Sequence, residues 1–307
     1  MNASTHTEVY RSFDGQLKAR PNRALTLAWS GVRIGFRRKL PALLLFIIPA
    51  IMTIVTSFIV QITFEAKTGN VPGMAPTQGQ VIGAMLADQL GDVEKHVLSL
   101  LRQLRTFVVL VMGWYGAGLI AEDKRLRASL LYFARPLTRW TYFLGKLGTV
   151  MFWGSCAVVL PVIIVSGVAA FASPEWAFVK ERWDVIVKML FYAFLWVFIH
   201  ALLVLAISSV CEKRNQALAG LFGFYILTSV GSVAMSKIFD GAAWRLISIP
   251  QNFERVAESL FGPQSQGILD RRSSGLPWSL EASAWALGIL SLACVFVLQT
   301  QTRKMEV

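Results

Sequence analysis

Long apolar runs alternate with short polar, charged segments along the whole chain. Six of these runs approach or exceed the roughly 20 residues that an α-helix needs to cross a bilayer. The predicted spans are residues 40–62, 106–121, 147–174, 189–211, 215–236 and 282–302. None of the six contains Asp, Glu, Lys or Arg. The second run is short, but it can be extended back towards Val97 if the side chains of Arg102 and Arg105 reach the headgroups. The pattern therefore predicts an all-α integral membrane protein with six transmembrane helices.

The polar N-terminal arm contains a second kind of pattern. Residues 1–22 are largely polar, and we expect them to form a mobile cytoplasmic lead. After them, apolar residues recur at helical spacing, while three arginines lie off that stripe. The stripe consists of Leu25, Ala28, Trp29, Val32 and Phe36. This arrangement favours a basic elbow helix in the inner membrane interface, with a bend near Pro41, over a plain extension of the first span.

A further amphipathic pattern lies in the external loop 237–281, before the last span. Here Phe253, Val256, Ala257, Leu260 and Phe261 are in helical register, but the segment is too short and too charged to cross the bilayer. A helix lying on the membrane surface is the favoured interpretation, and a re-entrant element is the alternative. Residues 23–302 are thus predicted to form one transmembrane domain, followed by a cytoplasmic tail at 303–307.

Composition and charge add the orientation. The chain of 307 residues is 55% hydrophobic and 16% charged, with a mean hydropathy of +0.54, which lies outside the range of ordinary soluble proteins. The N-terminal arm, the segment 122–146, the turn at 212–214 and the C-terminal tail together carry the whole formal net charge of +12, since the opposite loops balance. The positive-inside bias places both termini in the cytoplasm of a plasma (inner) membrane. Because the charge is a topology signal, it argues against nucleic-acid binding.

The segment from Glu122 to Lys146 is a dense basic and amphipathic stretch between two spans. Leu126, Leu130, Phe133 and Leu137 follow helical spacing. Pro136 disfavours a helical conformation for the residue before it, which predicts a short helix, a corner and a lead-in to the next span. The residues alone support two interpretations equally: a surface that docks on a soluble partner, or a basic loop that sets topology and touches anionic lipid.

Three parts of this segment form a distinctive set: Ile-Ala-Glu-Asp-Lys-Arg at 120–125, Leu-Leu-Tyr-Phe-Ala-Arg-Pro-Leu-Thr-Arg at 130–139 and Tyr-Phe-Leu-Gly-Lys at 142–146. This set resembles the cytoplasmic signature of ABC-2 type transporter permeases, the membrane subunits of ATP-driven pumps that mostly export. The six spans, the basic N-terminal helix and the amphipathic external segment are also similar to that family. The resemblance therefore covers nearly the whole chain.

The resemblance implies that residues 122–139 form a coupling helix docked on a nucleotide-binding subunit. The implied docking residues are Glu122, Asp123, Lys124, Arg125, Arg127, Leu130, Phe133, Pro136 and Arg139. The acidic pair would meet basic residues of the ATPase, the basic trio would meet acidic ones, and the two apolar residues would fill its groove. Pro136 and Arg139 would fix the corner. Glu212, Lys213 and Arg214 are a possible second contact, although a turn that sets topology is the favoured interpretation.

ATP chemistry is absent from this sequence. No GxxxxGK[ST] loop occurs, and Gly145-Lys146 lacks the upstream glycine and the following Ser or Thr of a phosphate-binding loop. The resemblance therefore implies a complex of two such membrane subunits, identical or different, with two cytoplasmic ATPase subunits that bind ATP and Mg²⁺. This chain is expected to hold no cofactor of its own and to catalyse no reaction.

Other classes of membrane protein fit less well. An intramembrane enzyme needs a nucleophile, base or metal cluster, whereas the spans offer His200 alone, which is expected to be packed and neutral. A secondary transporter usually keeps ionisable groups in its spans, and these spans have no carboxylates. A membrane scaffold or regulatory subunit for a cytoplasmic partner stays an alternative.

The substrate is weakly constrained. Polar side chains within the spans are the candidates for lining a pathway: Thr53, Thr56, Ser57, Gln61, Ser208, Ser209, Ser229 and Ser232. Together with many aromatic residues, they favour a lipid-like, peptide or drug-like substrate over a small ion. Cys156, Cys211 and Cys294 lie in or at the ends of spans, without the spacing of a metal site or a disulfide framework.

Overall fold

The computed structural model describes residues 22–37, 39–67, 93–126, 128, 138–262 and 278–304, and its regular elements there are all helical. The helices are α1 (Arg23–Phe36), α2 (Lys39–Lys67), α4 (Val93–Gly116), α5 (Gly118–Arg125), α7 (Arg139–Ala157), α8 (Val159–Ala172), α9 (Ala177–Glu181), α10 (Trp183–Val210), α11 (Arg214–Ile238), α12 (Ile249–Phe261) and α13 (Leu280–Lys304). Two 3₁₀ turns, η1 (Pro174–Trp176) and η2 (Ala242–Ile247), join some of them. The all-α prediction is confirmed.

Six stretches within the described residues are long and apolar enough to cross a membrane, as predicted. They are Phe46–Glu65, Val93–Arg125, Arg139–Ala172, Trp183–Val210, Arg214–Ile238 and Leu280–Arg303. The second stretch begins 13 residues before the predicted start at residue 106, because α4 is already buried at Val97, Leu100 and Leu104. Charged residues in these first turns lower the local hydropathy without ending the helix.

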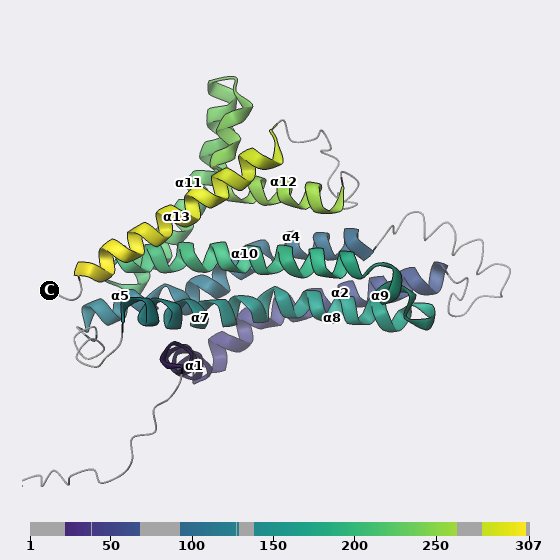
Figure 1. The fold of residues 1–307 in the computed structure, drawn as a ribbon, viewed down its shortest axis with the longest axis horizontal. Helices are drawn as coiled ribbons and strands as arrows, with labels where there is room; N and C mark the ends of the chain where they lie inside the picture. The colour runs from purple at the N-terminus through teal and green to yellow at the C-terminus, as the bar shows by residue number, and fades with distance from the viewer. Residues whose placement is uncertain are drawn as a thin grey trace, which may run out of the picture.

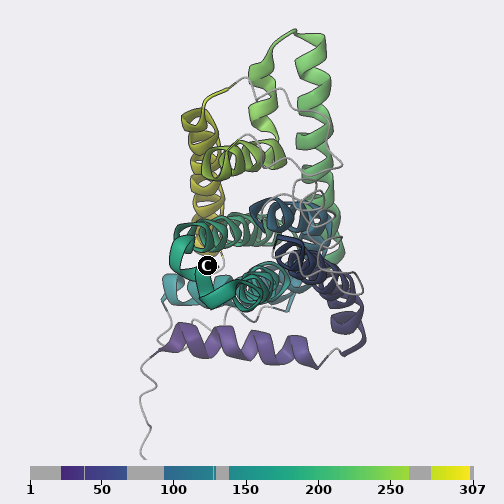
Figure 2. The ribbon, with the colours of Figure 1, turned by 90° about the vertical axis from the view of Figure 1, so that its right-hand side faces the viewer.

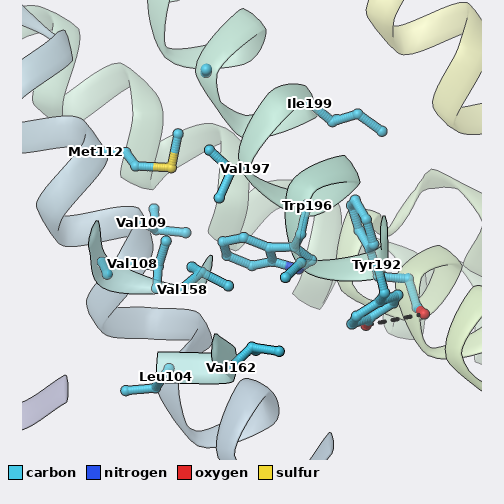
Figure 3. Packing of buried hydrophobic residues seen from close by; sticks show 14 of the residues in the cluster. Leu104, Val108, Val109, Met112, Val158, Val162, Tyr192, Trp196, Val197 and Ile199 are labelled. Carbon is cyan, nitrogen blue, oxygen red and sulfur yellow. Dashed lines mark hydrogen bonds between the residues drawn. The ribbon is translucent and has the colours of Figure 1, made fainter. Parts of the chain in front are cut away.

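Helix α10 lies at the centre of the bundle. Its apolar window is 67% buried, whereas the corresponding windows of α11 and α13 are only 17% buried. Trp196 and Val197 of α10 pack against Val109 and Met112 of α4 and against Val158 at the α7–α8 break (Figure 3). The helices around this core expose large apolar side chains, as expected for surfaces that face lipid or a second subunit.

Helix α1 lies across the bundle instead of along it. It is seen end-on in Figure 1, where α7, α8 and α10 run horizontally, and it is seen from the side in Figure 2. Three of its predicted stripe residues, Leu25, Trp29 and Phe36, are more than half exposed, while Val32 is buried. A basic helix with a partly uncovered apolar stripe is therefore present, and its place in the membrane interface stays a prediction.

A separate face of α1, made of small residues, packs on α7. A Cβ atom added at Gly31 would collide with the side chain of Thr149, and one at Gly35 would collide with the Trp153 indole. In the opposite direction, a Cβ at Gly145 of α7 would lie 2.7 Å from a side-chain atom of Leu27. The absent side chains let the two backbones approach closely, as in other small-residue membrane contacts.

Helix α12 is amphipathic as predicted, but it does not lie across the bundle. It runs beside α10 (Figure 1), and its Phe253 ring is centred 5.9 Å from the ring of Trp196 and 5.7 Å from that of His200. Both partners lie near the middle of α10. These contacts fit the re-entrant alternative better than a helix that lies on the membrane surface, and the position of α12 relative to the membrane stays a prediction. An apolar stripe shows that one face is covered, but it does not show whether lipid or protein covers it.

Candidate functional site

The second predicted span is divided near its C-terminal end. Helix α4 ends at Gly116 and α5 begins at Gly118, with Ala117 between them. The Ser208 hydroxyl of α10 accepts hydrogen bonds from the backbone N–H groups of Ile120 and Ala121, both at 3.2 Å. It also donates to the Ala117 carbonyl at 2.7 Å. Ser208 thus acts as a capping residue supplied by another helix, which fixes the start of α5 on α10.

The far end of α5 is held to α7 by a buried ion pair. Lys146 Nζ lies 2.6 Å from Asp123 Oδ2, and their side chains are 8% and 15% exposed. The Tyr142 hydroxyl donates to the same carboxylate oxygen at 2.7 Å, and Lys146 Nζ also donates to the Leu119 carbonyl at 2.9 Å. We call Asp123, Tyr142 and Lys146 the α5–α7 latch. Its partners satisfy one another, so the charges are tolerated in an apolar setting.

Two further cations attach this region to neighbouring helices. Lys124 Nζ donates to the Ser209 carbonyl in the last turn of α10 at 2.8 Å, where a cation is favoured by the helix dipole. The Arg214 guanidinium donates to the Trp114 carbonyl at 2.9 Å and lies 4.2 Å from the centre of the Trp114 ring. Residues predicted as contacts with an ATPase, Asp123, Lys124 and Arg214, thus have partners within the chain.

The other predicted docking residues divide into two groups. Arg125 and Arg139 are exposed, and Glu122 is partly exposed beside Gly118 and Arg214. Glu212 and Lys213 are exposed at the turn before α11. Arg127, Leu130, Phe133 and Pro136 lie outside the described residues. The structure therefore brings Glu122 to Arg125 together at one end of the bundle, directly before the undescribed part of the segment.

The pathway candidates are only partly brought together. Thr53, Ser57 and Gln61 line one groove of about 630 Å³ between α2 and the α7–α8 pair, which Cys156 also lines. The Ser57 hydroxyl is buried without a hydrogen-bond partner, while Thr53 donates to the Pro49 carbonyl at 2.6 Å. Thr56 is partly exposed outside the lining of this groove.

The serines of α10 and α11 do not line this groove. Ser208 and Ser209 are fully buried, Ser208 as the cap of α5 and Ser209 as a donor to the Ala206 carbonyl. Ser232 is 1% exposed and donates to the carbonyl of Ser229, which is itself partly exposed. The apolar surroundings of these hydroxyls on α10 and α11 made them resemble pathway residues. Ser208, Ser209 and Ser232 instead donate to backbone carbonyls, and Ser229 supplies the carbonyl that Ser232 bonds.

His200 is a packed residue, as expected. Its Nδ1 atom lies 2.7 Å from the Trp196 carbonyl, and its Nε2 atom contacts the Tyr225 hydroxyl of α11. The ring is 2% exposed and stacks on the Trp196 indole, with 3.7 Å between the ring centres. These contacts give His200 a structural role that links α10 to α11.

Sequence reasoning missed the latch and a second charged cluster. Tyr142 and Lys146 appeared only within the motif at 142–146 and were given no role as partners of Asp123. Arg102 and Arg105 of α4 both pair with Glu254 of α12, with Arg102 Nη2 at 2.7 Å from Glu254 Oε2. The only available signal was the presence of charges beside apolar runs, which does not identify their partners.

A comparison with known families agrees with these features. A family model described as "ABC-2 family transporter protein" matches residues 25–252, from α1 to the first turn of α12. No curated protein matches the chain. The matched region includes the α5–α7 latch, the Ser208 cap and the groove beside α2.

Proposed function

The chain belongs to the ABC-2 family of transporter proteins, and from this premise we propose that it converts ATP hydrolysis by a separate cytoplasmic subunit into export of an amphipathic or apolar substrate. The family assignment and the six spans make the chain a multi-pass membrane subunit of an ABC transporter. We further propose that both termini lie in the cytoplasm of the plasma (inner) membrane, and that a second permease subunit completes the translocation pathway.

The observation that carries the proposal is the double attachment of the segment between α5 and α7. Ser208 holds the start of α5 on α10, and the latch joins its end to α7. In the sequence, residues 127–137 connect one of these attached helices to the other. A partner that moves this segment therefore acts on spans two, three and four together, which is the requirement for coupling hydrolysis to substrate movement.

We expect Arg125→Glu to weaken the association with the ATPase. Arg125 is exposed at the end of α5, whereas Asp123 and Lys124 beside it are bound within the chain. Reversing one charge at an interface typically costs ~1–2 kcal/mol, so we expect about a tenfold lower affinity. Co-purification of the two subunits in mild detergent, followed by titration of the ATPase, measures it.

The matched control is Arg33→Glu, which reverses an exposed charge on α1. It should leave the association unchanged. If Arg125→Glu retained wild-type affinity and transport, the docking role of α5 would be rejected. If the membrane subunit failed to recover any ATPase under several gentle conditions, the proposed function itself would fail.

The groove beside α2 supports the proposed substrate class. It is lined mainly by apolar side chains, with Thr53, Ser57 and Gln61 as its polar members. Its size and polarity suit a lipid-like or drug-like molecule better than an inorganic ion, which needs several charged or carbonyl ligands. The substrate class stays part of the proposal.

Cys156 offers a direct test of the groove, since its thiol lines it beside Leu160 and Pro161. In a Cys211→Ser/Cys294→Ser background, we expect a lipid-soluble maleimide to label Cys156. Lysophosphatidylcholine should slow this labelling, whereas sucrose at the same concentration should not. Mass spectrometry of the labelled peptide gives the rate. Equal protection by both compounds, or by neither, would contradict an apolar substrate groove at this position.

A further inference from the structure

A polar pocket lies between α1, the α4–α5 junction and α7. It has a volume of about 210 Å³ and shares no lining residue with the groove beside α2. Residues three or four positions apart line it from each of these three sides, so each helix presents one face to the pocket. Ser30 and Ile34 on α1 are one such pair, and Thr149 and Trp153 on α7 are another. Arg214, at the start of α11, also lines the pocket.

Two buried polar groups line this pocket without a hydrogen-bond partner among the described residues. They are the Trp153 Nε1–H and the Tyr115 hydroxyl. Trp153 is 3% exposed, and its Nε1 edge faces Gly35 of α1, since a Cβ added to that glycine would lie 3.1 Å from Nε1. The two rings are stacked, with 4.0 Å between their centres, which fixes them relative to each other. Buried donors are normally satisfied, so a ligand with acceptor oxygens is favoured here.

The charges around the pocket balance. Glu122, Asp123, Lys146 and Arg214 all line it, which gives two carboxylates and two cations. Asp123 and Lys146 neutralise each other in the α5–α7 latch, and Glu122 is partly exposed at the pocket. A balanced lining of this kind favours a ligand that carries both charges over one with a net charge.

The edge of the pocket is apolar. Ile34 of α1 and Leu126 at the end of α5 both line it, and they are 61% and 68% exposed. Leu27 and Leu119 add further apolar surface to the lining. Exposed aliphatic side chains beside a polar pocket suit an amphipathic molecule, whose polar part enters while its apolar part lies along the edge.

We propose that this pocket binds the headgroup of a phospholipid that carries a phosphate and a primary amine, as phosphatidylethanolamine does. The phosphate oxygens accept hydrogen bonds from the Trp153 N–H and the Tyr115 hydroxyl, and the ammonium pairs with Glu122. The acyl chains leave the pocket past Ile34 and Leu126. The bound lipid thereby joins α1 to the α4–α5 junction and to α7.

This headgroup fits the lining better than two alternatives. A choline headgroup has no N–H to donate to the Glu122 carboxylate. It would instead need a cage of aromatic faces, whereas one face of Tyr115 and one of Trp153 are already used in their stacking. A glycerol headgroup leaves the phosphate charge without a cation of its own. The proposal depends on the predicted place of α1 at the membrane interface, but not on ATPase docking or on the exported substrate.

Native mass spectrometry of the purified membrane subunit alone tests this site. Dioleoylphosphatidylethanolamine, dioleoylphosphatidylcholine and dioleoylphosphatidylglycerol are titrated in parallel. We expect the wild type to bind the ethanolamine lipid about tenfold more tightly than the other two, and Glu122→Gln to remove this preference. Tyr115→Phe, which keeps the ring, should bind the ethanolamine lipid about fivefold more weakly than the wild type. The matched control is Tyr192→Phe, which removes a hydroxyl that donates to the Phe253 carbonyl and should bind like the wild type.

Thermal unfolding separates a ligand site from a merely structural one. Because the Tyr115 hydroxyl has no hydrogen-bond partner among the described residues, Tyr115→Phe should melt no lower than the wild type in lipid-free detergent. Added ethanolamine lipid should then raise its melting temperature less than that of the wild type. Soluble phosphoethanolamine should not displace the lipid, since it lacks acyl chains. Equal binding of the three lipids by the wild type, unchanged ethanolamine-lipid binding in both pocket variants, or full displacement by soluble phosphoethanolamine would each overturn the proposal.

Discussion

Replacing Asp123 by alanine is expected to destabilise the membrane subunit and to abolish the coupling of hydrolysis to transport. The substitution leaves the Lys146 ammonium, whose side chain is 8% exposed, without its carboxylate partner. Removing one member of a buried ion pair typically costs about 3–5 kcal/mol, because the other charge stays buried. It also detaches the end of α5 from α7, so movement of the segment between these helices would no longer be passed to the third span.

The reciprocal exchange makes this prediction specific to the latch. Asp123→Lys/Lys146→Asp restores opposite charges and should be more stable and better coupled than either single variant. Tyr142→Phe removes one hydrogen bond of 2.7 Å and should cost only about 1 kcal/mol. The measurements are thermal unfolding in detergent and the ratio of substrate transported to ATP hydrolysed in proteoliposomes. A stable, coupled Asp123→Ala variant, or an exchange no better than the singles, would show that the latch does not transmit movement.

The second large effect is expected at Glu254, the carboxylate that holds α12 against α4. Its oxygens pair with both Arg102 and Arg105, and all three side chains are 20–27% exposed. In Glu254→Gln, both guanidinium groups would lose the carboxylate that they share, at a cost of about 3 kcal/mol. We therefore expect α12 to separate from the bundle, which hydrogen–deuterium exchange of the α12 amides would record as faster exchange.

Glu258 provides the matched control within the same helix. Among the described residues its ion-pair partner is Arg255, three residues earlier, so Glu258→Gln should leave the α12 amides protected. Replacing Glu254, Arg102 and Arg105 together by leucine should restore protection, because no charge is then left buried. Slow exchange in Glu254→Gln itself would mean that the apolar contacts of Phe253 suffice to hold α12.

The six spans were predictable because each apolar run is longer than a globular core requires. The ends of the second span were not, since hydropathy falls at Arg102 and Arg105 although α4 continues there. Their partner, Glu254, lies about 150 residues later in the sequence, on α12. The position of α12 depends on tertiary contacts, which the local sequence pattern does not predict. The same limit explains why α12 was expected on the membrane surface.

The site shows a similar division. The chain position of the α5 region and its resemblance to a coupling element were evident from the motif Glu-Asp-Lys-Arg at 122–125. The roles of individual residues were not, because Asp123 and Lys124 are as charged as Arg125 and differ only in what lies beside them. Ser208 was interpreted as a pathway residue since a hydroxyl in an apolar run has the same appearance whether it faces a substrate or caps a neighbouring helix.

The packing of α1 on α7 limits the kind of movement that α7 can make. Gly31 and Gly35 of α1 lie directly against the side chains of Thr149 and Trp153, and Gly145 of α7 lies against Leu27, so sliding the two helices past each other would create collisions. If Leu25 and Trp29 lie in the membrane interface, as predicted, α1 would hold this point of α7 at a fixed depth. Movement transmitted through α5 would then tilt the third span about a fixed point near Thr149. The end of this span in α8 would move sideways, while the part of α7 next to α1 would stay in place.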